Sequence, residues 1–146
     1  MRRMMRNGRA LGLALMLGAL GACLPAQAQG GSSPLAGTSW RLVELNGQPP
    51  VAGGDTLTLV FAADEPRVSG YGGCNQFNGP YAQNGASLRF GPLASTRRAC
   101  LEPALNTQET AYFQALESTT RYAIEGGQLV LYRGNQVVAR FAPTSG

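Results

Sequence analysis

The stretch that decides the fold is Ser69-Gly-Tyr-Gly-Gly-Cys-Asn-Gln-Phe-Asn-Gly-Pro-Tyr81, which is followed by Thr96-Arg-Arg-Ala-Cys100. Each segment holds one cysteine within glycine-rich or polar, loop-like sequence, and strand-like or helix-like sequence flanks both. Cys74 and Cys100 are the only cysteines beyond the N-terminal leader. The two segments therefore mark two loops that a disulfide can join.

The N-terminus has the pattern of a secretory signal peptide. A segment with four arginines, residues 2–9, precedes an apolar run at residues 10–22. This run is shorter than the ~20 residues that span a bilayer as a helix. We therefore predict export, with a signal peptide over residues 1–22.

The sequence is compatible with two alternative cleavage sites for the signal peptide. Leu20-Gly-Ala-Cys23 resembles a bacterial lipobox, whose cysteine is lipidated and becomes the first residue of the mature protein. Ala26-Gln-Ala28 resembles an ordinary signal peptidase site, which would release a soluble periplasmic protein. The lipobox directly follows the apolar run, so we expect a lipid on Cys23. Leu24 after it favours sorting to the outer membrane, with the domain facing the periplasm.

The basic character of the precursor belongs to its leader. The chain has 12 basic residues, all arginine, and eight acidic residues. Because four arginines lie in the leader, the mature chain has eight of each and is neutral. A neutral domain lacks the basic surface that nucleic-acid binding requires, so we predict no nucleic-acid partner.

The two remaining cysteines favour a disulfide. The periplasm is oxidising, and the chain-entropy model assigns a bridge between Cys74 and Cys100 roughly 3.5 kcal/mol of stabilisation. The alternative is two separately buried thiols, because free cysteine packs as a small hydrophobe.

Strand patterns separated by turns make up most of the domain, with one helix among them. The connections between strands are too short for parallel crossovers. We predict an α+β fold: a mainly antiparallel, curved sheet of about eight short strands, a partial barrel, packed on one helix inserted after the fifth strand. The expected strands are 40–45, 56–61, 67–71, 77–82, 87–90, 121–124, 128–132 and 136–141. Gly79 and Pro80 suggest an edge or a bulge in the fourth.

The expected helix runs from residue 103 to residue 118. Leu105, Glu109, Tyr112 and Leu116 fall on one stripe of it, so Glu109 lies on a mostly apolar face. An unpaired carboxylate there is costly. We therefore expect Glu109 to be buried and bonded to Arg97, or to backbone amides of the loops around 74–75 and 96–100.

The residues offer no catalytic constellation. The chain contains no histidine, which removes the Ser-His-Asp and Cys-His nucleophile systems and most zinc sites. Glu102 and Glu109 would lie about 10 Å apart along a helix, too far for a retaining glycosidase. The glycines at 70–73 do not follow the spacing of a phosphate-binding loop. We predict no enzyme activity, no metal and no cofactor.

The pattern Gly-Cys-Asn-x-Phe-x-Gly-x-Tyr, followed by Thr-Arg-x-Ala-Cys, resembles the META domain, also called the HslJ-like domain after heat shock protein HslJ. The resemblance covers the META/HslJ-like domain, which we place at 35–142. With the signal peptide at 1–22, this leaves a flexible Gly/Ser/Gln/Pro-rich tether at 23–34 and a tail at 143–146. The motif positions to which we assign structural roles are Trp40, Gly73, Asn75, Gly79, Tyr81, Thr96, Arg97 and Glu109. From Asn75 we expect a local bond that holds the turn after Cys74.

One position departs from the family pattern. Where most members carry an apolar residue, often methionine, this chain has Arg98. Either Arg98 extends from the loop to water, or the loop surface differs from that of its relatives.

The resemblance implies a non-enzymatic envelope protein with a heat-shock or stress-response, structural or interaction role. We expect membrane contact through the lipid on Cys23, and an envelope protein is the candidate partner; the oligomeric state is open. The alternative is a small-molecule or lipid-binding module that uses a cavity between sheet and helix.

Overall fold

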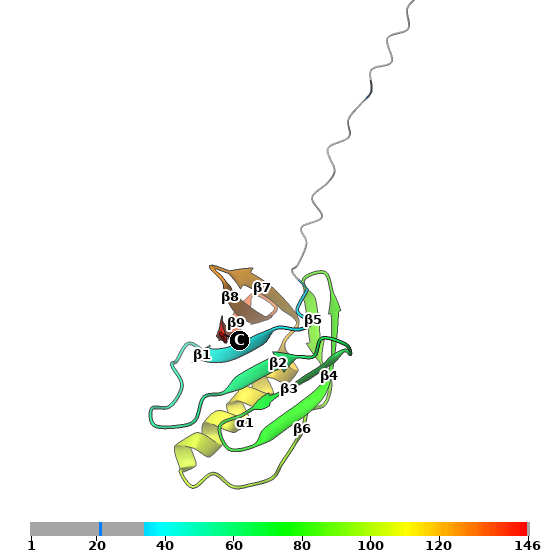
Figure 1. Ribbon diagram of the computed structural model, residues 1–146. Helices are drawn as coiled ribbons and strands as arrows, with labels where there is room; N and C mark the ends of the chain where they lie inside the picture. The colour runs from blue at the N-terminus through cyan, green and yellow to red at the C-terminus, as the bar shows by residue number, and fades with distance from the viewer. Residues whose placement is uncertain (1–20, 22–33, 146) are drawn as a thin grey trace, which may run out of the picture.

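The computed structural model of the chain describes Gly21 and residues 34–145 (Figure 1). The described residues do not include the predicted lipidation site Cys23, the rest of the expected tether up to residue 33 or, apart from Gly21, the predicted signal peptide. Within the described part, no helix has both the length and the apolar character needed to cross a bilayer.

Nine strands and one helix make up the described domain (Figure 1). In chain order they are β1 (Ser39–Leu45), β2 (Thr58–Phe61), β3 (Arg67–Tyr71), β4 (Gln76–Asn84), β5 (Ser87–Phe90), β6 (Ala94–Ser95), α1 (Pro103–Ser118), β7 (Arg121–Glu125), β8 (Gln128–Arg133) and β9 (Gln136–Pro143). The predicted α+β class is confirmed, and every predicted strand is present. Strand β6, which has only two residues, is not among the predicted strands.

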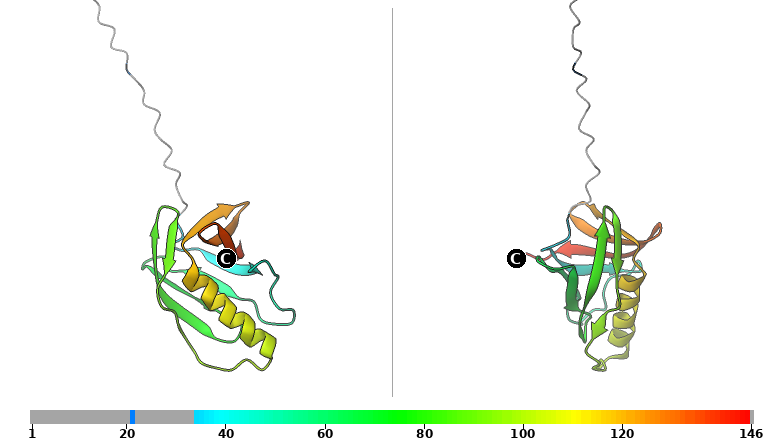
Figure 2. Two further views of the ribbon diagram at one scale, coloured as in Figure 1. Left: turned by 180° about the vertical axis from the view of Figure 1, so that it is seen from behind. Right: turned by 90° about the vertical axis from the view of Figure 1, so that its right-hand side faces the viewer.

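All nine strands form one antiparallel sheet that curls into a ring (Figures 1 and 2). Their order is β3-β2-β1-β9-β8-β7-β5-β4-β6, and an additional pairing of β3 with β4 closes the ring. Strand β4 makes this closure possible because its first part pairs with β3 and its last part with β5.

The predicted edge at Gly79 and Pro80 is wrong, but the pairing register does shift there: Asn78 pairs with Ala94 and Tyr81 with Phe90, so three steps along β4 face four steps between β5 and β6. Strand β4 is an interior strand: Phe77 pairs with Gly70 of β3 on one side and with Ser95 of β6 on the other. Pro80 is the last residue of β4 that pairs with β3, and the next residue pairs with β5. A proline is tolerated where the strand changes partner, because the ladder is interrupted there in any case.

Helix α1 packs against the inner side of the curved sheet (Figure 2). Its fully buried Tyr112 lies with its ring centroid 5.8 Å from that of Phe77 on β4 and 6.2 Å from that of Phe141 on β9. The Tyr112 hydroxyl donates to the carbonyl oxygen of Thr58 on β2 at 2.8 Å. One helical side chain thus contacts three strands of the ring.

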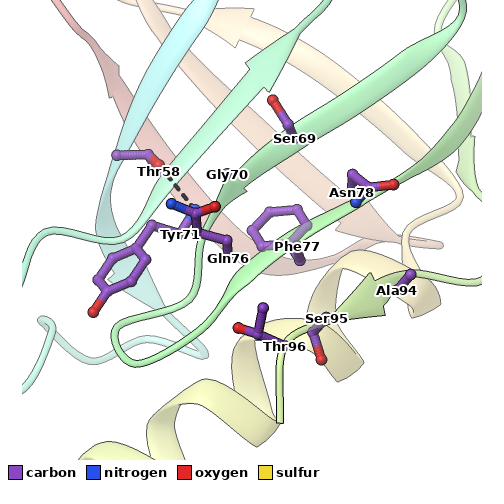
Figure 3. A pocket seen from close by; sticks show the side chains of 10 residues that line it. All are labelled: Thr58, Ser69, Gly70, Tyr71, Gln76, Phe77, Asn78, Ala94, Ser95 and Thr96. Atoms are coloured by element: carbon purple, nitrogen blue, oxygen red, sulfur yellow. Dashed lines mark hydrogen bonds between the residues drawn. The ribbon is translucent and has the colours of Figure 1, made fainter. Parts of the chain in front are cut away.

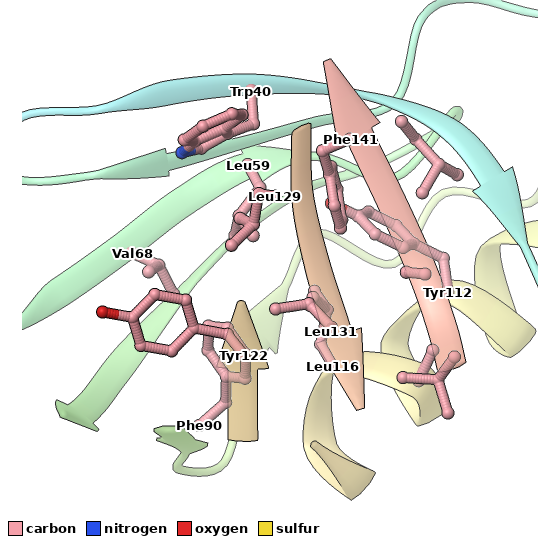
Figure 4. Packing of buried hydrophobic residues seen from close by; sticks show 14 of the residues in the cluster. Trp40, Leu59, Val68, Phe90, Tyr112, Leu116, Tyr122, Leu129, Leu131 and Phe141 are labelled. Atoms are coloured by element: carbon pink, nitrogen blue, oxygen red, sulfur yellow. The ribbon is translucent and has the colours of Figure 1, made fainter. Parts of the chain in front are cut away.

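The space enclosed by the sheet and α1 is filled with apolar side chains (Figure 4). Inward-facing positions of the strands alternate with exposed ones, as in β5, where Leu88 and Phe90 are buried. Each large apolar side chain buried in this way contributes about 1.5–3 kcal/mol. The fully buried members include Leu59, Phe61, Leu88, Tyr112, Leu116, Leu129, Leu131 and Phe141.

Candidate functional site

A buried carboxylate connects helix α1 to the loop between β3 and β4. Glu109 is only 6% exposed. Its Oε2 accepts hydrogen bonds from the backbone N–H groups of Cys74 at 2.9 Å and Asn75 at 2.7 Å. Its Oε1 accepts a further bond from the Asn75 side-chain amide. Three donors thus replace the water that the carboxylate loses on burial.

Asn75 carries the connection onward to the 96–101 loop, which follows β6. Its Nδ2 also donates to the carbonyl oxygen of Arg98 at 2.9 Å. Its Oδ1 accepts from the Thr96 hydroxyl at 2.9 Å and from the Arg98 backbone N–H at 2.8 Å. Every hydrogen-bonding position of the Asn75 amide is therefore used. The local bond expected for Asn75 is replaced by bonds to residues 21 to 34 positions away.

Arg97 is not the partner of Glu109. Among the described residues, no ion pair or side-chain hydrogen bond involves Arg97, whose side chain is exposed. The prediction that Glu109 is buried and bonded is confirmed, and of the partners expected for it the backbone amides of residues 74 and 75 are the ones it has, not Arg97. The neutral N–H groups suffice because each bond to a carboxylate is charge-assisted.

The predicted disulfide joins the same two loops. Cys74 and Cys100 are bonded, and their Cα atoms lie 5.5 Å apart. The two sulfurs and a carboxylate oxygen of Glu109 lie within 4.8 Å of one another. A disulfide offers no thiolate to a metal, however, and the Glu109 oxygens already accept three hydrogen bonds. The arrangement acts as a covalent and hydrogen-bonded clamp.

The glycines before Cys74 make room for this clamp. A Cβ at Gly72 would lie 2.8 Å from Oε2 of Glu109 and 2.9 Å from the ring of Phe113. Gly73 has a φ of 107°, a backbone conformation that residues with a side chain rarely adopt. The glycine-rich segment thus allows close approach of the backbone to the helix.

The loop that the clamp holds is itself exposed. Residues 94–99 are all exposed, and the side chain of Leu101 is 99% exposed. The guanidinium groups of Arg97 and Arg98 form no ion pair within the described part of the chain. A pocket of about 200 Å³ next to the disulfide is lined by Arg98, Leu101 and Leu105, among others.

The remaining motif residues lie away from the clamp. Trp40 donates from Nε1 to the Thr38 hydroxyl at 2.7 Å. Tyr81 packs edge-on against Phe61 with ring centroids 5.0 Å apart. At Gly79, a Cβ would lie 2.9 Å from the carbonyl oxygen of Pro92. The structure thus separates the motif into a clamp and a set of packing positions.

A larger groove lies on the outer face of the sheet, over β3, β4 and β6 (Figure 3). Its volume is about 630 Å³. The lining residues are Thr58, Ser69, Gly70, Tyr71, Gln76, Phe77, Asn78, Ala94, Ser95 and Thr96. The sequence does not predict this groove, because outward-facing polar residues of a strand have the pattern of any solvated face.

A second buried amide, which the sequence does not predict, bonds α1 to the loop between β1 and β2. The Oε1 of Gln108 accepts from the backbone N–H of Val51 at 2.6 Å, while its buried Nε2 has no partner within the described residues. No sequence pattern predicts this contact, because its two residues are 57 positions apart.

Comparisons with known proteins agree with the motif. The family model described as META domain matches residues 33–145. No curated protein matches the chain. An NMR structure of a protein from Burkholderia xenovorans is 30% identical, with a TM-score of 0.62, covering 77% of this chain and 85% of that one.

Two further solved structures share the fold. One NMR structure is 24% identical with a TM-score of 0.58, covering 73% of this chain and 89% of that one. The crystal structure of a DUF4847 family protein from Bacteroides vulgatus is 16% identical with a TM-score of 0.54, covering 74% and 93%. With the family model spanning nearly all of the described domain, the chain belongs to the META domain family.

Proposed function

We propose that this META-domain protein is a non-enzymatic interaction protein of the bacterial envelope, and that the 96–101 loop is its contact surface. The observation that carries the proposal is that a disulfide and a buried hydrogen-bond cluster fix a loop whose own side chains face solvent. Ordering a backbone costs about 1–2 kcal/mol per residue. A plain connection between β6 and α1 would need no such restraint.

The exposed side chains of the loop suit a protein partner. Leu101 offers an apolar anchor, and Arg97 and Arg98 offer two cations that no carboxylate of the described domain neutralises. Arginine is enriched in interfaces and among the residues that dominate binding energy. The partner we propose therefore presents acidic groups around an apolar recess.

The position of the loop supports contact with a partner rather than with the membrane. The Gln76 end of β4 holds the loop through the N–H of Thr96, and the Gln83 end holds the first described residues through the N–H of Leu35. Seven residues of extended strand separate these ends by roughly 23 Å. The loop and the start of the domain lie at opposite ends (Figures 1 and 2). With a lipid on Cys23 of an outer-membrane protein, the loop would face the periplasm.

The absence of enzyme activity is part of the proposal. The chain has no histidine, both domain cysteines are in a disulfide, and both oxygens of the buried Glu109 carboxylate are occupied by donors. None of these groups is available as a nucleophile or a general base. The alternative of a ligand cavity between sheet and helix gains no support, since buried side chains such as Tyr112 and Leu116 fill that space.

Site-specific photo-cross-linking in intact cells tests the proposal. We expect an adduct from a cross-linker at position 101, and none from a control cross-linker at position 124, where Ile124 is 39% exposed on β7. The adduct should disappear in an Arg97→Glu/Arg98→Glu variant and persist in Arg133→Glu, which changes an exposed arginine elsewhere. Equal adducts from positions 101 and 124, or an adduct that does not depend on the two arginines, would contradict the proposal.

A further inference from the structure

The outer groove has the size of a binding site and lies beside the 96–101 loop, with which it shares Thr96. Its volume of about 630 Å³ falls within the range of about 300–1,000 Å³ typical of ligand pockets. Val68 and Phe77 point into the core, whereas Ser69 and Asn78 beside them are exposed. The groove therefore lies on the face of the sheet opposite the core.

The groove is polar but carries no charge. Its ten lining residues include no aspartate, glutamate, lysine or arginine. They supply hydroxyl groups from Thr58, Ser69, Tyr71, Ser95 and Thr96 and carboxamides from Gln76 and Asn78. Hydroxyl and amide groups both donate and accept hydrogen bonds. Such a lining matches a ligand with many uncharged hydroxyl groups. The nearest charged groups, Arg67 and Asp55, lie at the rim and each bonds a lining side chain.

Several of these polar groups are already oriented. The Oδ1 of Asn78 accepts from Nη2 of Arg67 at 2.7 Å, which leaves the Asn78 N–H groups for a ligand. The Thr58 hydroxyl oxygen accepts from the Tyr71 backbone N–H at 3.0 Å, which leaves its O–H to donate (Figure 3). Preorganised donors reduce the entropy that binding costs.

Tyr71 adds an aromatic surface at one end of the groove. Its hydroxyl donates to Oδ2 of Asp55 at 3.3 Å. Burial, together with this bond to Asp55, raises the pKa of Tyr71 above its ordinary value of 10.0. The phenol is neutral at physiological pH, as an unperturbed phenol is too. A neutral phenol ring offers a flat apolar face beside its polar tip. Sugar rings present apolar C–H faces and polar rims, and the groove offers both kinds of surface.

We propose that this groove binds a neutral oligosaccharide chain. Hydroxyl and amide side chains would bond the sugar hydroxyls, and Tyr71 would pack against one sugar ring. An extended peptide fits less well, because the adjoining edge strand β6 has only two residues with which to pair. The groove does not include Arg97, Arg98 or Leu101, the side chains proposed to contact a protein partner, and it shares only Thr96 with their loop.

Nuclear magnetic resonance titration of the mature domain with chitotetraose, an oligomer of N-acetylglucosamine, and with maltotetraose, an oligomer of glucose, tests this. We expect saturable shifts of the amides of residues 69–71, 76–78 and 94–96 with at least one of them. A difference between the two sugars identifies the glycan source. Saturation with neither sugar at millimolar concentrations, or shifts located elsewhere, would overturn the proposal.

Matched variants make the test specific. Gln76→Ala/Asn78→Ala should weaken binding at least about fivefold, since each hydrogen bond lost is worth about two- to tenfold in affinity. Gln114→Ala, on the exposed side of α1, should leave binding unchanged. Thermal unfolding of each variant verifies that it is folded. Equal weakening by both variants, or the same shifts with an uncharged serine-glycine peptide, would refute a sugar site.

Discussion

Glu109 and Asn75 bond each other twice, through the backbone N–H and the side-chain amide of Asn75, and both residues are more than nine-tenths buried. This double contact joins helix α1 to the β3–β4 loop. The remaining polar atoms of Asn75 then bond the 96–101 loop. The helix thereby fixes the loop through hydrogen bonds that run by way of Asn75.

Glu109→Gln should lower the free energy of unfolding by about 1–3 kcal/mol. All three partners of the carboxylate are N–H donors. Whichever way the new amide turns, its NH₂ group faces at least one of these donors: one at the Oε1 position and two at the Oε2 position. Urea unfolding measures the change. The matched control is Glu102→Gln, because the exposed Glu102 makes no side-chain cap bond. Equal stability of Glu109→Gln and the parent would remove the structural role of the carboxylate.

Asn75→Asp should lower the free energy of unfolding by more than about 2 kcal/mol at neutral pH. The substitution puts a carboxylate oxygen where Nδ2 now donates to Glu109 and to the Arg98 carbonyl. Burial and repulsion raise the folded-state pKa of the introduced carboxyl above its unfolded value of about 3.9. The folded state then binds more protons, so the penalty is small below about pH 4 and grows as pH rises.

Asn75→Ala is the control for this pH dependence. It removes the same hydrogen bonds without adding a charge, so its loss of stability should change little between acidic and neutral pH. Unfolding of both variants across that range distinguishes repulsion from lost bonds. If the two variants showed the same pH profile, the geometry assigned to Nδ2 would be incorrect.

The sequence predicts those parts of the fold that local patterns determine. The bounds of α1 follow from Pro103 and the apolar stripe, and the bounds of β3 and β5 follow from alternation between turn signals. Strand β6 has no such pattern, because two residues are too few to alternate. Pro80 suggested an edge that is absent. The change of partner along β4 depends on the closure of the ring, which is not a local property of the sequence.

The clamp was predictable only in part. The position of Glu109 on an apolar face predicts that it is buried and bonded. Which donors it meets depends on how two loops fold back on the helix, and a carboxylate beside neutral N–H groups needs no arginine. Asn75 has the pattern of a turn residue, yet its side chain reaches residues 23 and 34 positions away.

Removal of the disulfide by Cys74→Ala/Cys100→Ala should lower stability by about 2–4 kcal/mol. The loop it closes spans 26 residues, and the unfolded chain gains freedom when the bond is absent. Hydrogen exchange should also quicken at the amide of Arg98, which bonds Asn75 within the clamp. The reduced parent should behave in the same way. Unchanged exchange in both samples would show that hydrogen bonds alone hold the loop.

Alkaline pH should destabilise the domain through Tyr112. Complete burial raises the pKa of Tyr112 well above its usual value of 10.0. Above about pH 10 the unfolded state therefore binds fewer protons than the folded state, and stability falls as pH rises. In Tyr112→Phe, the free energy of unfolding should fall less steeply with rising pH. The variant should also be about 1 kcal/mol less stable at neutral pH, because it lacks the hydrogen bond to Thr58. If Tyr112→Phe lost stability at alkaline pH as steeply as the parent, the alkaline destabilisation would come from other groups.

Cys23 should carry the lipid that attaches the domain to the membrane. In the lipobox reading, the mature chain begins at Cys23, and intact-mass analysis of membrane-extracted protein should show a diacylated or triacylated N-terminus. Cys23→Ala removes the acceptor sulfur and should move the mature protein out of the outer-membrane fraction. Ala28→Leu is the matched control, because it disables only the alternative signal peptidase site. A mature chain that begins at Gln29 would instead make this a soluble periplasmic protein.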